Sequence, residues 1–252
     1  MDLQMKGDVV LVTGSSSGIG RATAIMFGVE GARVAVTYHR NKSGAEDTAR
    51  AVREAGSEAL VMPYDLGSPD AIRACLEQVE RQWGVLHALV NNAAPMDTAS
   101  PSRGNFEDVP LEHWETMLRP TLEGVVLTIQ CSLPLMRKSG RGRMVHVSSD
   151  AVDGWPGLGP YATAKAGLEG LNRTLAVELG PAGILSNIVM PGAVMTERTA
   201  RNLKPEHREQ IKARAATRQL TTPEDVAAVI VFLASQRNRQ VTGEVIRVTG
   251  GR

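Results

Sequence analysis

This sequence contains little that would support a metal centre or a covalent scaffold. Only Cys75 and Cys131 are cysteines among the 252 residues, and neither has a second cysteine or a histidine at ligand spacing. The five histidines are scattered along the chain, and none is assigned a metal role. These absences argue against a disulfide framework and a zinc site, and they favour a reducing, cytoplasmic location.

A large excess of one charge is also missing. The sequence has 28 Lys+Arg against 27 Asp+Glu, so the net charge is close to zero. Nucleic acid and anionic membranes attract proteins with a strongly basic surface, so neither is an expected partner. A small neutral ligand or a cofactor fits this composition better.

No hydrophobic run is long enough to cross a membrane. The longest, Val226 to Ala234, is about half of a membrane span, and Met1 to Gly7 is too short and polar for a signal peptide. The sequence also has no recognisable linker or repeat. We therefore predict a soluble protein in which residues 1–252 form a single domain with a substantial core.

Short apolar segments alternate with helical patterns along the whole chain. Strands alternating with helices are typical of a parallel sheet with right-handed crossovers. The expected class is α/β: a single-domain, Rossmann-type doubly wound fold with a seven-stranded, mainly parallel sheet and helices on both faces. The predicted strands are Asp8 to Thr13, Ala32 to Tyr38, Ala59 to Pro63, Leu86 to Val90, Met144 to Val147, Leu185 to Met190 and Glu244 to Val248.

A glycine-rich turn, Gly14 to Gly20, follows the first predicted strand and leads into a helical pattern. Glycines let the backbone approach a ligand closely, and a helix N-terminus offers N–H groups and a positive dipole end to a pyrophosphate. The spacing is G-x3-G-x-G rather than the common fingerprint G-x-G-x-x-G, so a plain turn is the alternative.

The end of the second predicted strand bears on which dinucleotide would bind there. Tyr38-His39-Arg40-Asn41-Lys42 offers no acid to the ribose 2′-hydroxyl. Arg40 could instead bind a 2′-phosphate through two parallel charge-assisted hydrogen bonds. We therefore predict NADP(H) rather than NAD(H), with a solvated basic turn as the alternative.

Polar residues also follow the third and fourth predicted strands. Asp65 could accept a hydrogen bond from an adenine amino group, cap the helix that begins near Pro69, or be a plain turn residue. Asn91 to Ala94 suits a place where backbone is held while a ring passes close by. Pro95 to Pro110 is a long connection that would overhang the carboxyl edge of the sheet, where we expect it to shape a substrate pocket.

Tyr161 and Lys165 stand four residues apart in a helical pattern, so they share one helix face. A phenol with an ordinary pKa of about 10 needs a shift of about three units, roughly 4 kcal/mol, to work near neutrality. An ammonium about 6 Å away contributes about 2.8 kcal/mol at a protein-like dielectric, so Lys165 is expected to lower the pKa of Tyr161. The alternative is a buried tyrosine beside a solvated lysine.

Two further helical segments have unusual compositions. Leu111 to Met136 predicts a long helix bent at Pro120, because proline has no N–H to donate to the helix. Residues 197–218 hold seven Lys or Arg and three Glu with few large apolar side chains. Such a segment should pack thinly, and we interpret it as a mobile lid; a solvated surface helix is the alternative, and the two are compatible.

Taken together, the motifs resemble those of the short-chain dehydrogenase/reductase family in its compact single-domain form, from about Lys6 to the C-terminus. They are Thr13 to Gly20, Asn91 to Ala94, Ser149, Tyr161 with Lys165, and Pro191-Gly192. In that family the tyrosine is the general acid/base, the lysine lowers its pKa and holds the nicotinamide ribose, and a serine binds the substrate oxygen. The resemblance implies these roles for Tyr161, Lys165 and a serine after the fifth strand.

The choice of serine depends on how the fifth strand is aligned. The family's usual spacing to the tyrosine lands on Ser148, whereas alignment of the strand itself gives Ser149. A one-residue strand slip would turn every side chain to the other face, and a loop deletion costs little. We prefer Ser149 and keep Ser148 in reserve.

Two positions depart from the family pattern. Ala94 replaces the usual glycine, and Thr121 replaces an asparagine that in many members helps to hold a water between the lysine and bulk solvent. We count Thr121 among the catalytic candidates and hypothesise that a proton relay survives through its main-chain carbonyl, at the bend made by Pro120. The residues predicted to contact the dinucleotide are Gly14, Ser16, Ser17, Gly18, Ile19, Gly20, Tyr38, His39, Arg40, Asp65, Leu66, Asn92, Ala93, Ala94, Tyr161, Lys165, Pro191, Gly192, Val194 and Thr196.

The resemblance implies an NADPH-dependent enzyme that reduces a ketone to a secondary alcohol by hydride transfer, with Tyr161 as general acid. A non-catalytic dinucleotide sensor or scaffold on the same fold is the alternative. A methyltransferase would want an acid near Tyr38 and would have no use for Tyr161 with Lys165.

The substrate stays open at this point. The basic segment 197–218 could meet an acidic carrier protein, as in 3-oxoacyl-carrier-protein reductases, whereas Trp155, Pro95-Met96 and Met195 suit an apolar or aromatic ketone, including a polyketide. By resemblance we also expect a homotetramer that assembles through the helices at Leu111 to Met136 and Tyr161 to Leu179.

Overall fold

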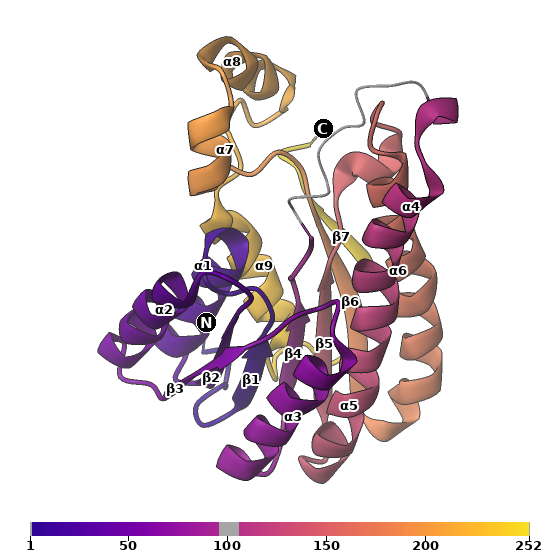
Figure 1. The fold of residues 1–252 in the computed structure, drawn as a ribbon. Coiled ribbons are helices and arrows are strands. Elements are labelled where there is room, and N and C mark those ends of the chain that lie inside the picture. Colours follow the sequence, from indigo (N-terminus) through magenta and orange to yellow (C-terminus); the bar gives the residue numbers. More distant parts are fainter. Residues whose placement is uncertain (1, 96–105, 252) are drawn as a thin grey trace.

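The computed structural model describes residues 2–95 and 106–251. They form one seven-stranded sheet with helices packed against it (Figure 1). The strand order is β3-β2-β1-β4-β5-β6-β7, and each neighbouring pair is parallel. The strands are β1 (Val9–Val12), β2 (Arg33–Tyr38), β3 (Ala59–Pro63), β4 (Ala88–Asn91), β5 (Gly142–Val147), β6 (Ile184–Pro191) and β7 (Val245–Val248). The predicted doubly wound α/β fold is confirmed.

The strand order reverses at β1, which pairs with β2 on one side and with β4 on the other. In open parallel sheets this switch point leaves a crevice outside the carboxyl ends of the strands, where ligands bind. The loops that follow β1, β2, β4, β5 and β6 all begin at that edge. The topology therefore gathers the polar motifs of the sequence at one place.

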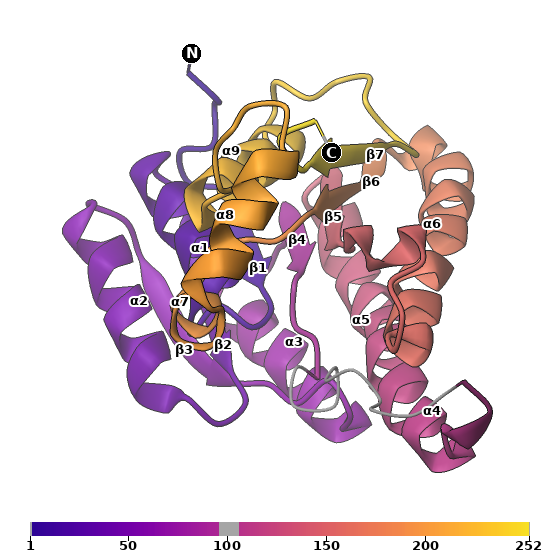
Figure 2. The ribbon, with the colours of Figure 1, turned by 90° about the horizontal axis from the view of Figure 1, so that it is seen from above.

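Helices cover both faces of the sheet (Figure 2). Val10 and Val12 of β1 pack in one buried cluster, while Val9 and Leu11 pack in the other, as the two-residue period of a strand requires. The first cluster includes α1 (Gly18–Val29), α2 (Lys42–Glu54) and α9 (Pro223–Ala234), and the second includes α3 (Pro69–Trp83), α5 (Val125–Lys138) and α6 (Gly159–Leu179).

The predicted helix from Leu111 to Met136 is interrupted where proline predicts it. It consists of α4 (Leu111–Leu118), a π-helical segment η2 (Arg119–Gly124) and α5. Pro120 lies in the wide turn, since its nitrogen cannot donate a helical hydrogen bond. At Gly124 a Cβ would come within 2.1 Å of the Leu66 carbonyl oxygen, so only glycine allows η2 to pack on the loop after β3.

The basic segment after β6 forms two short helices, α7 (Glu197–Asn202) and α8 (Pro205–Arg214), which rise beyond the carboxyl edge of the sheet (Figure 1). Neither helix has a buried residue, in agreement with the thin packing that its composition predicts. Movement of this segment as a lid stays a prediction.

Three short 3-10 segments complete the described elements: η1 (Phe106–Asp108), η3 (Asp150–Asp153) and η4 (Gly180–Ala182). Predicted strand ends differ from the observed ones by at most two residues: β4 begins at Ala88 rather than Leu86, and β5 begins at Gly142 rather than Met144. No helix in residues 2–95 or 106–251 has the length and apolarity that a membrane crossing needs.

Candidate active site

The turn between β1 and α1 is built so closely that its three glycine positions leave no room for a side chain. Gly14 and Gly18 have left-handed backbones, with φ of +68° and +54°. A Cβ on Gly20 would lie 2.4 Å from the Gly14 carbonyl oxygen and 2.6 Å from the side-chain amide of Asn92. Helix α1 begins at Gly18, and the side chain of its N-cap, Ser17, makes no capping hydrogen bond. The turn fits the predicted pyrophosphate cradle.

Asn92 ties the end of β4 to this turn. Its side-chain amide donates to the carbonyl oxygens of Thr13 (2.9 Å) and Gly14 (3.1 Å). The Thr13 hydroxyl in turn accepts from the backbone N–H groups of Asn92 (2.9 Å) and Ala93 (3.0 Å). The amides of the Asn91 to Ala94 motif thus hold backbone in place, as the sequence predicts.

Asp65 forms a turn rather than a helix cap. Its carboxylate accepts from the N–H of Gly67 (2.9 Å) and lies 3.6 Å from Nε2 of His39. The cap of α3 is Ser68, whose hydroxyl accepts from the N–H of Ala71. The capping alternative for Asp65 is therefore wrong. Together with the exposed Arg40, Asp65 and His39 form the polar edge beyond β2 and β3.

Tyr161, Lys165 and Ser149 come together at the carboxyl end of β5. The buried ammonium of Lys165 donates to the Val147 carbonyl oxygen at 2.7 Å and lies 5.8 Å from the centroid of the Tyr161 ring. The hydroxyl of Ser149 interacts with the phenol of Tyr161 and lowers its pKa. Ser148 is buried, and its hydroxyl has no partner within the described ranges. The serine next to the phenol is thus Ser149.

The electrostatics of this cluster differ from the sequence prediction. Burial raises the pKa of Tyr161; the interaction with Ser149 lowers it, and the neighbouring carboxylate of Asp150 raises it. Burial also lowers the pKa of Lys165 to about 8. The simple Coulomb argument neglected the cost of removing both groups from water, which here outweighs the attraction. Asp150 was missed, although an acid directly after Ser149 could have signalled it.

Thr121 is fully buried in η2, and its hydroxyl donates to the sulfur of Met117 at 3.7 Å. The side chain therefore points toward a thioether and offers no replacement for the amide of asparagine. A relay through the main-chain carbonyl of Thr121 stays a hypothesis, supported by the π-helical distortion, which is frequent at functional sites.

The chain after β6 runs over the glycine turn. Gly192 donates its N–H to the Val248 carbonyl oxygen, which holds the Pro191-Gly192 bend against β7. Farther on, the methyl group of Thr196 lies 3.2 Å from the Cβ position of Gly18. Thr196 also caps α7 by accepting from the N–H of Thr199. Thr196 therefore lies at the glycine turn, whereas a Cβ on Gly192 would lie 3.5 Å from the carboxylate of Asp150.

Glu197 is a site residue that sequence reasoning missed. Its carboxylate accepts from the N–H of Gly18 at 3.3 Å and pairs with the guanidinium of Arg21 at 3.1 Å. A carboxylate of the protein itself thus lies at the N-terminus of α1, the end of a helix that binds anions. The acid one residue after Thr196 was the available signal, but only the fold brings it to the glycine turn.

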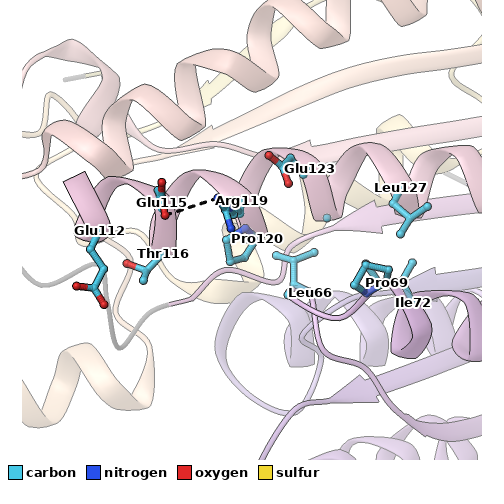
Figure 3. A pocket seen from close by; sticks show the side chains of 12 residues that line it. Leu66, Pro69, Ile72, Glu112, Glu115, Thr116, Arg119, Pro120, Glu123 and Leu127 are labelled. Carbon is cyan, nitrogen blue, oxygen red and sulfur yellow. Dashed lines mark ion pairs between the residues drawn. The ribbon is translucent and has the colours of Figure 1, made fainter.

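A pocket of about 510 Å³ lies beside η2, and Tyr161 is not among the residues that line it (Figure 3). Leu66, Pro69, Ile72 and Leu127 form its apolar side, and Glu115 and Arg119 form an ion pair of 3.6 Å at its edge. Ser149 and Lys165 are also not among the residues that line this pocket. The side chain of Leu66, a predicted dinucleotide contact, faces this pocket.

Two further points from the sequence concern the connection from Pro95 to Pro110 and metal binding. Positions 96–105 of the connection that should shape the substrate pocket, Met96 among them, lie outside the described residues. No group of three or more His, Cys, Asp or Glu side chains suited to a metal ion occurs in the ranges that the structure describes.

A parallel sheet with a glycine turn at its switch point, and a serine, a tyrosine and a lysine beside it, defines a dinucleotide-binding oxidoreductase. A family model described as Enoyl-(Acyl carrier protein) reductase matches residues 14–252. The 3-oxoacyl-[acyl-carrier-protein] reductase of Thermotoga maritima is 37% identical over 253 residues, which cover 99% of each chain. The chain belongs to the short-chain dehydrogenase/reductase family, and resembles its 3-oxoacyl-carrier-protein reductases.

Solved structures agree with this assignment. A short-chain dehydrogenase from Burkholderia cenocepacia in complex with NADP is 31% identical, with a TM-score of 0.88 and coverage of 98% of each chain. A 7α-hydroxysteroid dehydrogenase complexed with NADH and 7-oxoglycochenodeoxycholic acid is 27% identical, with a TM-score of 0.92, and the match covers 99% of this chain and 96% of that one. This chain is accordingly an oxidoreductase of a family that binds nicotinamide dinucleotides.

Proposed function

We propose that this protein uses NADPH to reduce a ketone to a secondary alcohol. The observation that supports it best is the meeting of three side chains at the carboxyl end of β5: the ammonium of Lys165 lies 5.8 Å from the centroid of the Tyr161 ring, and the hydroxyl of Ser149 interacts with the phenol and lowers its pKa. A substrate oxygen that meets both hydroxyl groups would find two O–H donors at one point. The dinucleotide supplies the hydride.

Each residue has a distinct role in this reduction. Because burial raises the pKa of Tyr161, its phenol keeps its proton at neutral pH and can give it to the carbonyl oxygen as negative charge develops. Ser149 donates a hydrogen bond to the same oxygen. Lys165 spends one N–H on the Val147 carbonyl, which fixes its position, and retains others for the ribose and for stabilising the phenolate that remains.

NADP(H) is the proposed cofactor because the end of β2 lacks a carboxylate and presents Arg40, an exposed guanidinium suited to a 2′-phosphate. The NADP complex of the Burkholderia cenocepacia protein supports the proposal, whereas the 7α-hydroxysteroid dehydrogenase was solved with NADH. Catalytic efficiency with NADPH and with NADH should be compared. A preference for NADH would contradict the assignment to Arg40.

The proposed substrates are ketones within largely apolar molecules. The similar proteins act on a 3-oxoacyl chain attached to a carrier protein and on a 7-oxo steroid acid, judging by their names and ligands. For this chain, the basic helices α7 and α8 would suit an acidic carrier, and Trp155 and Met195 would suit an apolar body. A panel of 3-oxoacyl thioesters, polyketide-like diketones and oxosteroids, followed by NADPH oxidation, would separate these classes.

Substitution of the tyrosine tests the mechanism. Y161F should still bind NADPH but lose at least about a hundredfold in kcat, the usual contribution of a positioned proton donor. S149A should lose activity as well, whereas S148A serves as its matched control because that hydroxyl is buried away from the phenol. Full turnover by Y161F would refute the role of Tyr161. Tight NADPH binding by the wild type without turnover of any ketone would favour a dinucleotide sensor.

A further inference from the structure

A row of buried polar side chains crosses the sheet beside the anchor of Lys165. It begins at Asn91, the last residue of β4, passes through His146 of β5 and Ser186 of β6, and ends at Asn172 of α6. All four side chains are at most 3% exposed. The mechanism proposed above uses none of them, and His146 was one of the histidines without a predicted role.

The hydrogen bonds of this row have one consistent direction. The amide nitrogen of Asn91 lies 3.0 Å from Nδ1 of His146, which must therefore accept, so the imidazole hydrogen is on Nε2. Nε2 lies 3.1 Å from the hydroxyl oxygen of Ser186, and that hydroxyl donates to Oδ1 of Asn172 at 2.7 Å. The amide of Asn172 then donates to the Glu244 carbonyl oxygen at 3.3 Å. In this arrangement each of these four contacts joins a donor to an acceptor when the imidazole is neutral, and Oδ1 of Asn91 has no partner among the described residues.

The charge around His146 agrees with this protonation state. Burial and, after it, the positive charge of Lys165 together lower its pKa to about 4. The imidazole consequently stays neutral over the whole range in which a phenol and an ammonium do acid–base chemistry.

The row connects the three parts of the site to one another. His146 directly precedes Val147, whose carbonyl oxygen holds Lys165. Asn172 stands seven residues after Lys165, so the two residues project from the same face of α6, and each is bonded to a strand of the sheet. At the other end, Asn91 directly precedes Asn92, which is bonded to the glycine turn. His146 thus joins the lysine helix to the strand that holds the cofactor loop.

We infer that His146 is a positioning residue: its neutral imidazole, bonded on both sides, fixes α6 and Lys165 relative to the glycine turn. This inference rests on the proposed function. His146 itself contacts neither a substrate nor a cofactor, and it acts through the carbonyl oxygen of Val147 and through Asn172. An apolar side chain at position 146 would leave the Asn91 amide and the Ser186 hydroxyl without partners and would remove the link between β4, β5 and α6.

The test compares substitutions that keep different halves of the link. H146L removes both hydrogen bonds, H146N can still accept from Asn91, and H146Q can still reach Ser186. The readouts are Tm, the Kd for NADPH from fluorescence titration, and kcat and KM for a reactive ketone, all well below each Tm. H146L should lower kcat/KM about ten- to a hundredfold, as expected when reacting groups are displaced by a fraction of their spacing.

NADPH binding should respond in the same variant. H146L should raise the Kd for NADPH about tenfold, comparable to the loss of one hydrogen bond to a charged group. H146N and H146Q should each recover part of both losses. S186A, which interrupts the same row with a smaller change, should show the same pattern and keeps the inference testable if H146L does not fold.

A matched control separates positioning from stability. Asn238 is equally buried and bonded, to the carbonyl oxygens of Leu233 and Val241, but it lies at the amino end of β5, where its own carbonyl oxygen accepts from Arg143. N238L should lower Tm without changing kcat/KM. If H146L and S186A lower only Tm, as N238L does, the inference is wrong. If the wild type reduces no ketone, the proposed function fails, while the Kd for NADPH still tests the positioning role independently.

Discussion

At the scale of single residues, the active site depends on small differences between neighbours. Ser148 and Ser149 are adjacent in sequence, yet one hydroxyl is enclosed and the other interacts with the phenol of Tyr161. Strand alternation turns consecutive side chains to opposite faces of a sheet, and Ser148 and Ser149, directly after β5, differ in the same way. The register of β5, which pairs Val147 with Val189 of β6, therefore decides which serine lies next to the phenol.

Asp150 gives a prediction at this scale. Its carboxylate raises the pKa of Tyr161, so D150N should lower that pKa. In alcohol oxidation the phenol must first lose its proton, and the pH profile of kcat/KM with NADP⁺ should consequently move to lower pH. D153N is the control, because Asp153 pairs with Arg247 (2.6 and 2.8 Å). An unchanged profile in D150N would show that the carboxylate has no influence on the phenol.

At the scale of elements, α1 and α7 meet through a contact that a dinucleotide must alter. The carboxylate of Glu197 accepts from the first N–H of α1 and pairs with Arg21. A pyrophosphate at the same helix end would bring a second anion to the same N–H group. Binding of the cofactor and the placement of α7 should therefore be coupled.

Neutralisation of Glu197 tests this coupling. E197Q should bind NADPH about two- to fivefold more tightly at low ionic strength, since an interaction of this kind with a helix end is worth a few tenths to about 1 kcal/mol. E206Q changes an acid in the first turn of α8 and should leave the Kd unchanged. Weaker NADPH binding by E197Q would mean that the carboxylate organises the site instead of competing for it.

The whole molecule is expected to associate through α5 and α6. Val177 of α6 is 78% exposed, which is unusual for a large apolar side chain and fits a surface that a second copy covers. If the proposed homotetramer forms, V177E should reduce the mass measured by light scattering after size-exclusion chromatography. V29E changes a similarly exposed valine at the end of α1 and should leave the assembly intact. A wild-type monomer would contradict the tetramer.

The fold could be predicted from sequence because its signals are local. A β-branched run before Gly14 and helical spacing after Gly20 define a strand, a turn and a helix without any long-range information. The roles of Asp150, Glu197 and His146 could not be predicted, since each depends on a partner that only the folded chain supplies. The predicted shift of the Tyr161 pKa was wrong in direction for a related reason. Burial depends on the elements that surround a residue, and sequence spacing does not report it.

The π-helical turn at η2 determines which side chains of α4 face α6, the helix that carries Tyr161. A π-helical turn is an α-helix that has gained a residue, so α4 is rotated relative to α5 by about 100°, the angle of one residue. In the observed orientation Trp114 lies 3.6 Å from the Cβ position of Gly159 and stacks edge-on against Phe106, with ring centroids 5.9 Å apart. A single-residue deletion in η2 would turn a different row of α4 side chains toward α6. Such a deletion would move Trp114 away from Gly159 although neither residue had been substituted.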